Sequence, residues 1–328
     1  MKPVLVSGMK TEGPQHLGNY LGALKHYVDL QNSGDYECYF FLADLHSLSE
    51  DFDPKEKPRQ ILELAAEYLA AGLDPKKSTI FLQSGVPAHA ELMWLLTTIT
   101  PEGEARRMTQ YKDKVSAKKL EANLGLLMYP ILMAADILLY DAKIVPVGDD
   151  QLQHLELTRT LARKFNRKFG DVFIEPKGLL TKTPRVMSLK DPSKKMSKSQ
   201  PESCLFIDDS PKEIAQKIAR ATTDSDGAIA YDPGKKPGLS NLLEIYAALK
   251  NTTPEKIAEE FAGKNYSDLK KLLSTVIADH FADFRTKKKA LLGKPAGLTK
   301  ILDAGSKEAA HIAEKKLKEV KEKMGLTL

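Results

Sequence analysis

The alternation of short apolar runs with longer helical patterns over the first half of the chain limits the fold most. These runs are rich in β-branched and aromatic residues and span residues 4–7, 38–43, 79–83 and 143–147. Strands that alternate with helical segments belong to parallel sheets, because each crossover needs a helix. The sequence therefore predicts an α/β fold with a parallel sheet.

The boundaries of one helix are visible in the sequence. Asp53 offers a capping side chain, Pro54 suits a first helical turn, and Glu56 follows three residues after Asp53. A helix is therefore expected to begin at residues 53–56. Gly72 is expected to end it.

The pattern changes to helices and loops at about residue 200. Ser210 and Glu213 form a second capping box. Further helical patterns span residues 241–249, 254–261 and 269–280. We therefore expect a catalytic domain at residues 1–200 and a smaller, all-helical domain at residues 201–328.

The last helical segment carries one apolar stripe. Its members, spaced three or four apart, are Ala310, Ala313, Leu317, Val320 and Met324. This stripe is expected to pack back on the body, and the lysines beside it are interpreted as a solvated face. For the densest basic run, residues 285–289, a solvated helix end and a phosphate contact both stay open.

Composition excludes several classes of protein. The chain has 328 residues, 42% hydrophobic and 28% charged, which is typical of a soluble protein. Its longest uncharged stretch, residues 122–135, is too short to span a bilayer, and no signal peptide precedes the first strand. Cys38 and Cys204 form neither a metal-spaced pair nor a disulfide framework, so we expect a cytoplasmic protein without a protein-bound metal. The net charge of +5 suits a polyanion partner without requiring one.

The loop after the first strand is a candidate anion site. It runs from Gly8 to a helix expected near Gly18 and Asn19, so backbone amides and a helix N-terminus face its ligand. It is not a P-loop, because Gly13 is followed by Pro14 rather than by Lys, and no Gly-x-Gly-x-x-Gly follows a strand. A different scheme for binding a nucleotide is needed.

Two motifs supply that scheme. The tetrapeptide His16-Leu17-Gly18-Asn19 and the pentapeptide Lys195-Met196-Ser197-Lys198-Ser199 resemble the two signatures of class I aminoacyl-tRNA synthetases, with Asn19 where a second histidine is common. The resemblance implies a Rossmann-like domain that binds ATP with Mg²⁺, with His16, Asn19, Lys195 and Lys198 as catalytic residues. Activation is attack of a carboxylate on the α-phosphorus, and ammonium and imidazole donors stabilise the negative charge of that transition state. Taken alone, His16 also reads as a packing or capping histidine, and the lysines as a solvated turn.

A narrower resemblance covers nearly the whole chain. The segments that carry it are residues 18–24, 132–138, 145–151, 187–189 and 236–243, and they resemble the bacterial tryptophanyl-tRNA synthetase family. The family implies a homodimer that activates L-tryptophan with ATP and charges tRNA(Trp). It also implies ATP contacts from Lys10, Thr11, Glu12, Gly18, Asn19, Gly148, Asp149, Asp150, Val186, Lys195, Met196, Ser197, Lys198 and Ser199. It makes His46 and Gln151 candidates for the amino-acid pocket, although a structural hydrogen bond and a helix cap are their plainer interpretations.

Spacing gives independent support for tryptophan. Tyr129, Met133 and Asp136 share one face of an apolar helix. A carboxylate there must be satisfied, and the single N–H of an indole suits it. The alternative is that Asp136 pairs with a structural lysine or arginine.

The tyrosyl-tRNA synthetases are the close sister family. They usually carry glutamine where Met133 stands and a tyrosine on the first strand near Val6, so this chain lacks those polar groups for tyrosine. The chain also departs from the tryptophanyl family pattern at residues 10–12 and at Val6, where an aromatic residue is often found, which leaves kinetics and pocket packing open. Two competitors remain: a nucleotidyltransferase of the same superfamily, which would lack the helical domain, and a synthetase relative repurposed as a binding module, which would show damaged signatures.

Overall fold

A five-stranded parallel sheet organises the first half of the molecule. The computed structural model describes residues 2–109, 123–180 and 185–327. The sheet order is β3-β2-β1-β4-β5, with strands β1 Val4–Lys10, β2 Glu37–Ala43, β3 Ser78–Leu82, β4 Ile144–Val147 and β5 Lys177–Leu180. Every pairing is parallel, as the alternating pattern predicts. The strand order reverses beside β1, which opens a crevice at its carboxyl end.

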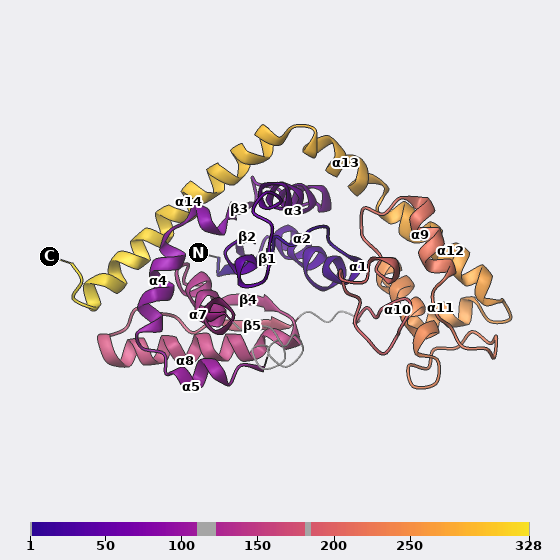
Figure 1. Ribbon diagram of the computed structural model, residues 1–328, viewed down its shortest axis with the longest axis horizontal. Helices are drawn as coiled ribbons and strands as arrows, with labels where there is room; N and C mark the ends of the chain where they lie inside the picture. Colours follow the sequence, from indigo (N-terminus) through magenta and orange to yellow (C-terminus); the bar gives the residue numbers. More distant parts are fainter. Residues whose placement is uncertain (1, 110–122, 181–184, 328) are drawn as a thin grey trace.

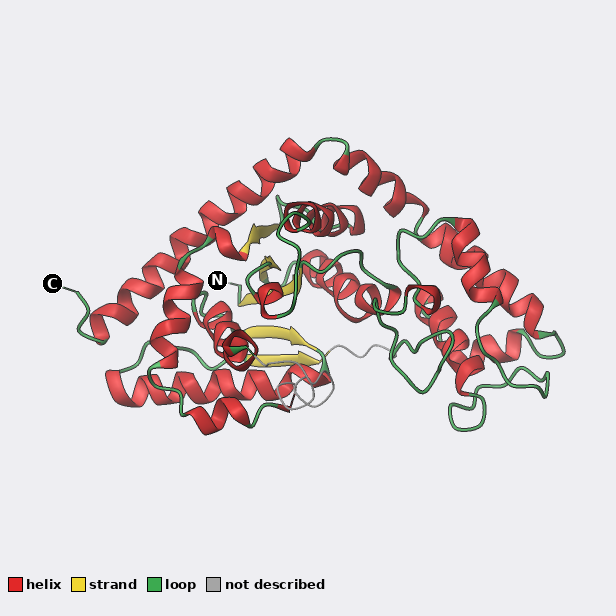
Figure 2. Cartoon of the chain, viewed as in Figure 1, coloured by secondary structure: helices red, strands yellow, loops and turns green. Residues whose placement is uncertain are grey.

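Helices follow each strand and then form a separate body (Figure 2). In the sheet half they are α1 Leu17–Asn19, α2 Lys25–Ser33, α3 Lys57–Ala71, α4 Ala88–Thr97, α5 Glu102–Arg106, α7 Leu124–Leu138 and α8 Leu152–Phe169, with short turns η1 Tyr20–Leu24, η2 His46–Ser49, η3 Gln83–Gly85 and η4 Asp149–Gln151. In the second half they are η5 Pro201–Ser203, α9 Pro211–Ala219, α10 Pro237–Lys250, α11 Pro254–Glu260, α12 Tyr266–His280, α13 Ala282–Leu292 and α14 Pro295–Lys323.

Burial of both faces explains why the strand signals are continuous apolar runs. On β2, Phe40 and Leu42 face a core with α2 and α3, whereas Tyr39 and Phe41 face a second core with α4, α7 and α8. Six successive residues of this strand are buried. A parallel sheet covered on both sides excludes polar side chains from the middle of its strands. Polar functional side chains are therefore kept out of the middle of the strands and lie at the strand ends or on the covering helices, as Asp136 does on α7.

The helix expected from residue 53 begins later than predicted. The α-helix starts at Lys57, and Asp53 instead accepts the N–H of Lys55 at 2.9 Å in a preceding turn. Pro58 explains the difference, because it has no N–H to donate to the carbonyl of residue 54. Gly72 ends the helix in the left-handed conformation (φ +118°), as predicted.

The capping box at Ser210 is confirmed. Its hydroxyl accepts the N–H of Glu213, and the Glu213 carboxylate accepts the N–H of Ser210. The other expected helices are present. Two of them begin earlier than their apolar patterns, at Pro237 and Tyr266.

The last helix lies along the outer edge of the sheet. α14 contacts β3, α3 and α4, and crosses back from the helical body over the sheet half (Figure 1). Ala313, Leu317 and Val320 of the predicted stripe are buried, whereas Ala310 and Met324 are partly buried. The Ser306 hydroxyl accepts the N–H of Leu82 at 3.3 Å. α14 thereby covers an edge strand that would otherwise present unpaired backbone groups.

The helical body has its own core, and the signature motifs contribute to it. Leu17, Leu21, Val186 and Met196 pack with apolar residues of helices α9–α13. Conversely, α14 belongs to the cores of the sheet half. The core of the helical body thus extends to both signature motifs.

Gly305 allows α14 to approach β3, and its substitution should weaken the fold. A Cβ at this position would lie 2.0 Å from the carbonyl oxygen of Ile80. We expect Gly305→Ala to lower the free energy of unfolding by about 1–3 kcal/mol, because the backbones must separate.

Gly297, in the first turns of the same helix, is the matched control, since a Cβ there has no described atom within 4 Å. Gly297→Ala should raise stability by up to ~1 kcal/mol through helix propensity. Urea unfolding of both variants measures the effect. Equal stabilities for the two would contradict the close contact.

Candidate active site

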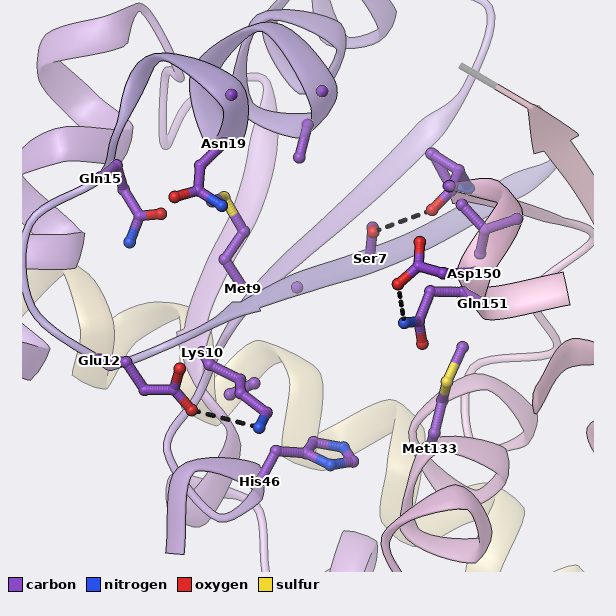
Figure 3. Close-up of a pocket in the computed structure, with 18 of the residues that line it drawn as sticks. Ser7, Met9, Lys10, Glu12, Gln15, Asn19, His46, Met133, Asp150 and Gln151 are labelled. Atoms are coloured by element: carbon purple, nitrogen blue, oxygen red, sulfur yellow. Dashed lines mark hydrogen bonds and ion pairs between the residues drawn. The ribbon is translucent and has the colours of Figure 1, made fainter. Parts of the chain in front are cut away.

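A cavity of about 970 Å³ opens at the carboxyl ends of β1, β2 and β4. Every expected site residue except Thr11 lines it. These residues are Lys10, Glu12, His16, Gly18, Asn19, His46, Tyr129, Met133, Asp136, Gly148, Asp149, Asp150, Gln151, Val186, Lys195, Met196, Ser197, Lys198 and Ser199. In the close-up, Asn19 lies on one side of β1, and Met133, Asp150 and Gln151 lie on the other (Figure 3). The cavity lining thus comes from both sides of the first strand.

The first signature is a tightly capped turn. The Nδ1 atom of His16 accepts the N–H of Asn19 at 3.2 Å, and the Asn19 side chain accepts the N–H of His16 at 3.3 Å. His16 is thus the helix cap of its plainer interpretation and also lines the cavity. A Cβ at Gly18 would come within 2.9 Å of the His16 ring, so glycine makes room for the imidazole.

The protonation of His16 follows from this geometry. Burial and the nearby Lys198 ammonium lower the pKa of His16 to about 4. The ring is therefore neutral at physiological pH. Because Nδ1 accepts a hydrogen bond, the proton resides on Nε2, which remains as a donor.

The second signature lies against the first. The Lys198 ammonium donates to the carbonyls of Glu12 and Gly13 at 3.2 and 3.3 Å. Burial lowers the pKa of Lys198, although Glu67 and Glu12 oppose this shift. Lys195 and Ser197 are exposed at the mouth of the cavity, whereas Met196 is buried in the core of the helical body.

Residues 10–12 have different environments in and around the cavity. Lys10 forms ion pairs with Glu12 at 3.2 Å and with Glu50 at 3.5 Å. Thr11 is fully buried and does not line the cavity. Its hydroxyl hydrogen-bonds to that of Ser47 at 3.0 Å, and Lys57 donates to its carbonyl at 3.3 Å. Its predicted contact with ATP stays a prediction.

Asp136 is the most tightly held side chain of the cavity. Its Oδ1 accepts from Gln83 at 2.7 Å and from His89 at 2.6 Å, and its Oδ2 accepts from His46 at 2.7 Å. Burial would raise the pKa of Asp136, but His46 and His89 outweigh it and lower the pKa to about 2. The alternative that Asp136 pairs with a structural lysine or arginine was wrong, because its two ionisable partners are His46 and His89.

A directional chain of hydrogen bonds fixes the neighbouring wall. The Tyr129 hydroxyl contacts His154 Nε2 at 3.0 Å, His154 Nδ1 contacts Gln151 Oε1 at 3.0 Å, and the Gln151 amide donates to Asp150 at 2.9 Å. Since an amide oxygen only accepts, His154 Nδ1 carries the proton and Tyr129 donates to Nε2. Gln151 occupies the cap position of α8, but its side chain does not cap the helix.

Sequence reasoning missed five contributors to this site: Lys57, Gln83, His89, Tyr140 and His154. Two could have been found from helical spacing, because Tyr140 follows Asp136 by four residues and His154 follows Gln151 by three. Gln83 directly follows β3, at the functional edge of the sheet. His89, which bridges Asp136 and the Tyr140 hydroxyl, lies on α4 without any spacing signal.

Two searches of the described residues concern metals and membranes. Within residues 2–109, 123–180 and 185–327, no three side chains of metal-ligating type come together to hold an ion. None of the helices in the same ranges combines the length and apolar character that crossing a membrane requires.

Comparison with known proteins identifies the family. A family model described as tRNA synthetases class I (W and Y) matches residues 1–282. The tryptophan–tRNA ligase of Bacillus anthracis is 46% identical, over 99% of this chain and 98% of that protein. The tryptophanyl-tRNA synthetase structure of Mycoplasma pneumoniae has a TM-score of 0.89 at 35% identity, covering 100% of this chain and 99% of the other.

A second solved structure matches over a similar length. The tryptophanyl-tRNA synthetase of Campylobacter jejuni, solved with ADP and tryptophan, has a TM-score of 0.85 at 35% identity, with 98% of this chain and 99% of the other covered. Family match, sequence identity and fold agree over the length of the chain. The chain belongs to the tryptophan–tRNA ligase family of class I aminoacyl-tRNA synthetases.

Proposed function

We propose that this chain activates L-tryptophan with ATP, releasing pyrophosphate, and then transfers tryptophan from the adenylate to the 3′ end of its tRNA. The observation that carries the proposal is the hydrogen bonding of Asp136. An ionised carboxylate has about four acceptor positions. Three are taken by His46, His89 and Gln83, so one position stays open on Oδ2 for a donor in the cavity.

An indole fits this opening better than a phenol does. The indole ring offers one N–H and accepts nothing, so it satisfies the open position completely. A phenol hydroxyl would also need a donor, and the neighbouring Met133 thioether supplies none. A site built around one polar contact discriminates strongly against ligands that leave groups unpaired. Tyr129 and His46 complete the aromatic surroundings.

The other end of the cavity suits the triphosphate. The Lys198 ammonium has three N–H donors, of which two are used by backbone carbonyls, so one is available for a phosphate oxygen. Lys195 and the Nε2–H of neutral His16 add two further donors. Donors held in place before charge develops lower the barrier to attack on the α-phosphorus. Asn19 orients His16 through the capping box.

Mg²⁺ would arrive with ATP in this scheme. The described residues provide no cluster of three ligating side chains, so phosphate oxygens would hold the ion. Gly148, Asp149 and Asp150 follow β4 at the sheet edge and are proposed to contact the nucleotide. Val186 packs close to Gly18 and is proposed to border the adenine.

The remaining assignments concern partners. We propose that residues 201–328 carry the tRNA-binding domain, that the chain acts in the cytoplasm, and that it forms a homodimer. A repurposed binding module is disfavoured because His16, Lys195, Lys198 and Asp136 all line one cavity.

ATP/pyrophosphate exchange with each of the twenty amino acids, without tRNA, tests the function directly. We expect exchange with tryptophan alone, followed by charging of tRNA(Trp) when tRNA is added. Exchange driven by tyrosine would overturn the assignment of the pocket. Silence with every amino acid would overturn the reaction itself.

Asp136→Asn tests the recognition of the indole. An amide has one accepting oxygen, so it cannot serve three donors and an indole N–H together. We expect KM for tryptophan to rise about 10- to 100-fold, the equivalent of about 1.5–3 kcal/mol for a lost charged hydrogen bond. KM for ATP should stay constant and serves as the internal control. An unchanged KM for tryptophan would contradict the role of Asp136.

The lowered pKa of His16 makes the stability of the protein dependent on pH. Between its ordinary pKa of 6.5 and about 4, the unfolded chain binds a proton at this ring while the folded chain does not. The free energy of unfolding therefore falls as pH decreases through this window, and above it the group contributes no pH dependence.

Urea unfolding of wild type and His16→Asn near pH 7 and near pH 5 measures the contribution of this ring. The variant should lose less stability on acidification than the wild type does. Equal losses, or an NMR titration midpoint of the His16 ring near 6.5, would refute a neutral imidazole.

A further inference from the structure

Lys288 behaves unlike the rest of the basic run at residues 285–289. Its ammonium pairs with Glu67 at 2.8 Å and with Asp208 at 2.6 Å. Lys288 is 6% exposed and Glu67 is fully buried, whereas Lys287 and Lys289 are exposed. Of the two interpretations that the sequence left open, neither a solvated helix end nor a phosphate contact describes this residue.

One of these carboxylates contacts the residue before the first signature motif, and the other follows a residue that pairs with it. Glu67 Oε1 also accepts the backbone N–H of Gln15, the residue before His16, at 3.2 Å. Asp208 follows Ile207, whose N–H donates to the Gln15 carbonyl at 3.1 Å. Both backbone groups of Gln15 are therefore tied to segments that Lys288 joins.

The segment at residues 205–208 also pairs with the first two residues of the motif. His16 forms an isolated antiparallel bridge with Phe206, and the N–H of Leu17 donates to the carbonyl of Leu205 at 2.8 Å. The three elements that meet here are α3 of the sheet half, the segment at residues 205–208, and α13. Lys288, on α13, forms an ion pair with one residue of each of the other two elements.

Stability alone does not explain a buried pair of this kind. Removing charges from water costs free energy, and apolar replacements of buried ion pairs are often neutral or stabilising. Such pairs are best attested where they fix one arrangement among several. Here the arrangement that they fix is the position of the motif that caps and aims His16.

We propose that Lys288 is a positioning residue for ATP: through Glu67 and Asp208 it fixes the Gln15–His16 turn against the nucleotide end of the cavity. This role rests on the proposed activation reaction. It acts on the ATP end only, because the hydrogen-bond partners of Asp136 among the described residues, His46, Gln83 and His89, include none of these residues. It also makes the geometry of the nucleotide site depend on where α13 lies.

Lys288→Met is the direct test, with Lys287→Met and Lys289→Met as exposed controls on the same helix. In pyrophosphate exchange we expect kcat/KM for ATP to fall about tenfold or more, because small displacements of reacting groups cost large factors in rate. KM for tryptophan should stay within about twofold, because its pocket keeps all its partners. The two control variants should match the wild type. Unchanged ATP parameters in folded Lys288→Met would overturn the proposal.

A double variant separates positioning from mere neutralisation of a buried charge. Lys288→Met combined with Glu67→Gln leaves no unpaired carboxylate at Glu67, so its midpoint in urea should recover toward that of the wild type. If Lys288 positions the turn, the ATP defect persists in the double variant. Recovery of ATP kinetics together with stability would overturn the proposal. The double variant also decides the question if the single variant fails to fold.

Failure of the proposed function can be told apart from failure of this inference. Calorimetric titration with ATP alone, without amino acid, gives Kd for wild type and variants independently of exchange. If the wild type exchanges with no amino acid, the activation reaction is wrong. A weaker Kd for ATP in the double variant but not in the controls would still support positioning by Lys288, and equal Kd values would overturn it.

Discussion

Burial of the sheet on both faces is the constraint on which the rest of the structure depends. Because β2 contributes large apolar side chains to two cores, its middle has no place for a polar group. The parallel strands all point the same way, so their polar continuations meet at one edge. The segments 10–19, 44–50 and 148–151 continue from three neighbouring strands, and each contributes side chains to one cavity there. The site is a consequence of strand direction.

Within this edge, Asp136 shows how a charge is kept in a core. It lies on an apolar helix and is 1% exposed, which would favour its protonated form. Three donors from different elements hold the ionised form instead. One of these donors has a further partner, because His89 also hydrogen-bonds to the Tyr140 hydroxyl at 2.8 Å. The proposed acceptor of the ligand N–H is therefore held in place by side chains behind it, His89 and Tyr140.

The sequence predicted the parts of the fold that are determined locally. Strand positions, the stop at Gly72 and the capping box at Ser210 follow from neighbouring residues, and all are present. The start of α3 was wrong because Pro58 overrules the earlier capping signal.

The parts that escaped prediction are contacts between distant segments. The signature motifs, the family resemblance and the spacing of Tyr129, Met133 and Asp136 together pointed to residues that line one cavity. The partners of Asp136 lie 47 to 90 residues away in the chain, and those of Lys288 lie 80 and 221 residues away. No pattern within one segment can report such pairings, since they exist only after the layers pack. For this reason the role of Lys288 in the basic run was not visible in the sequence, whereas the two interpretations of its exposed neighbours stay open.

The course of α14 has a consequence for the order in which the molecule can be completed. This helix is synthesised after every strand of the sheet, yet it covers the β3 edge of that sheet. Until residues 295–323 have emerged, β3 keeps a row of unpaired backbone groups open to other chains. A nascent chain of this protein therefore has an exposed, aggregation-prone edge strand from the synthesis of β3 until that of α14. Packing of α14 against β3 ends this exposure.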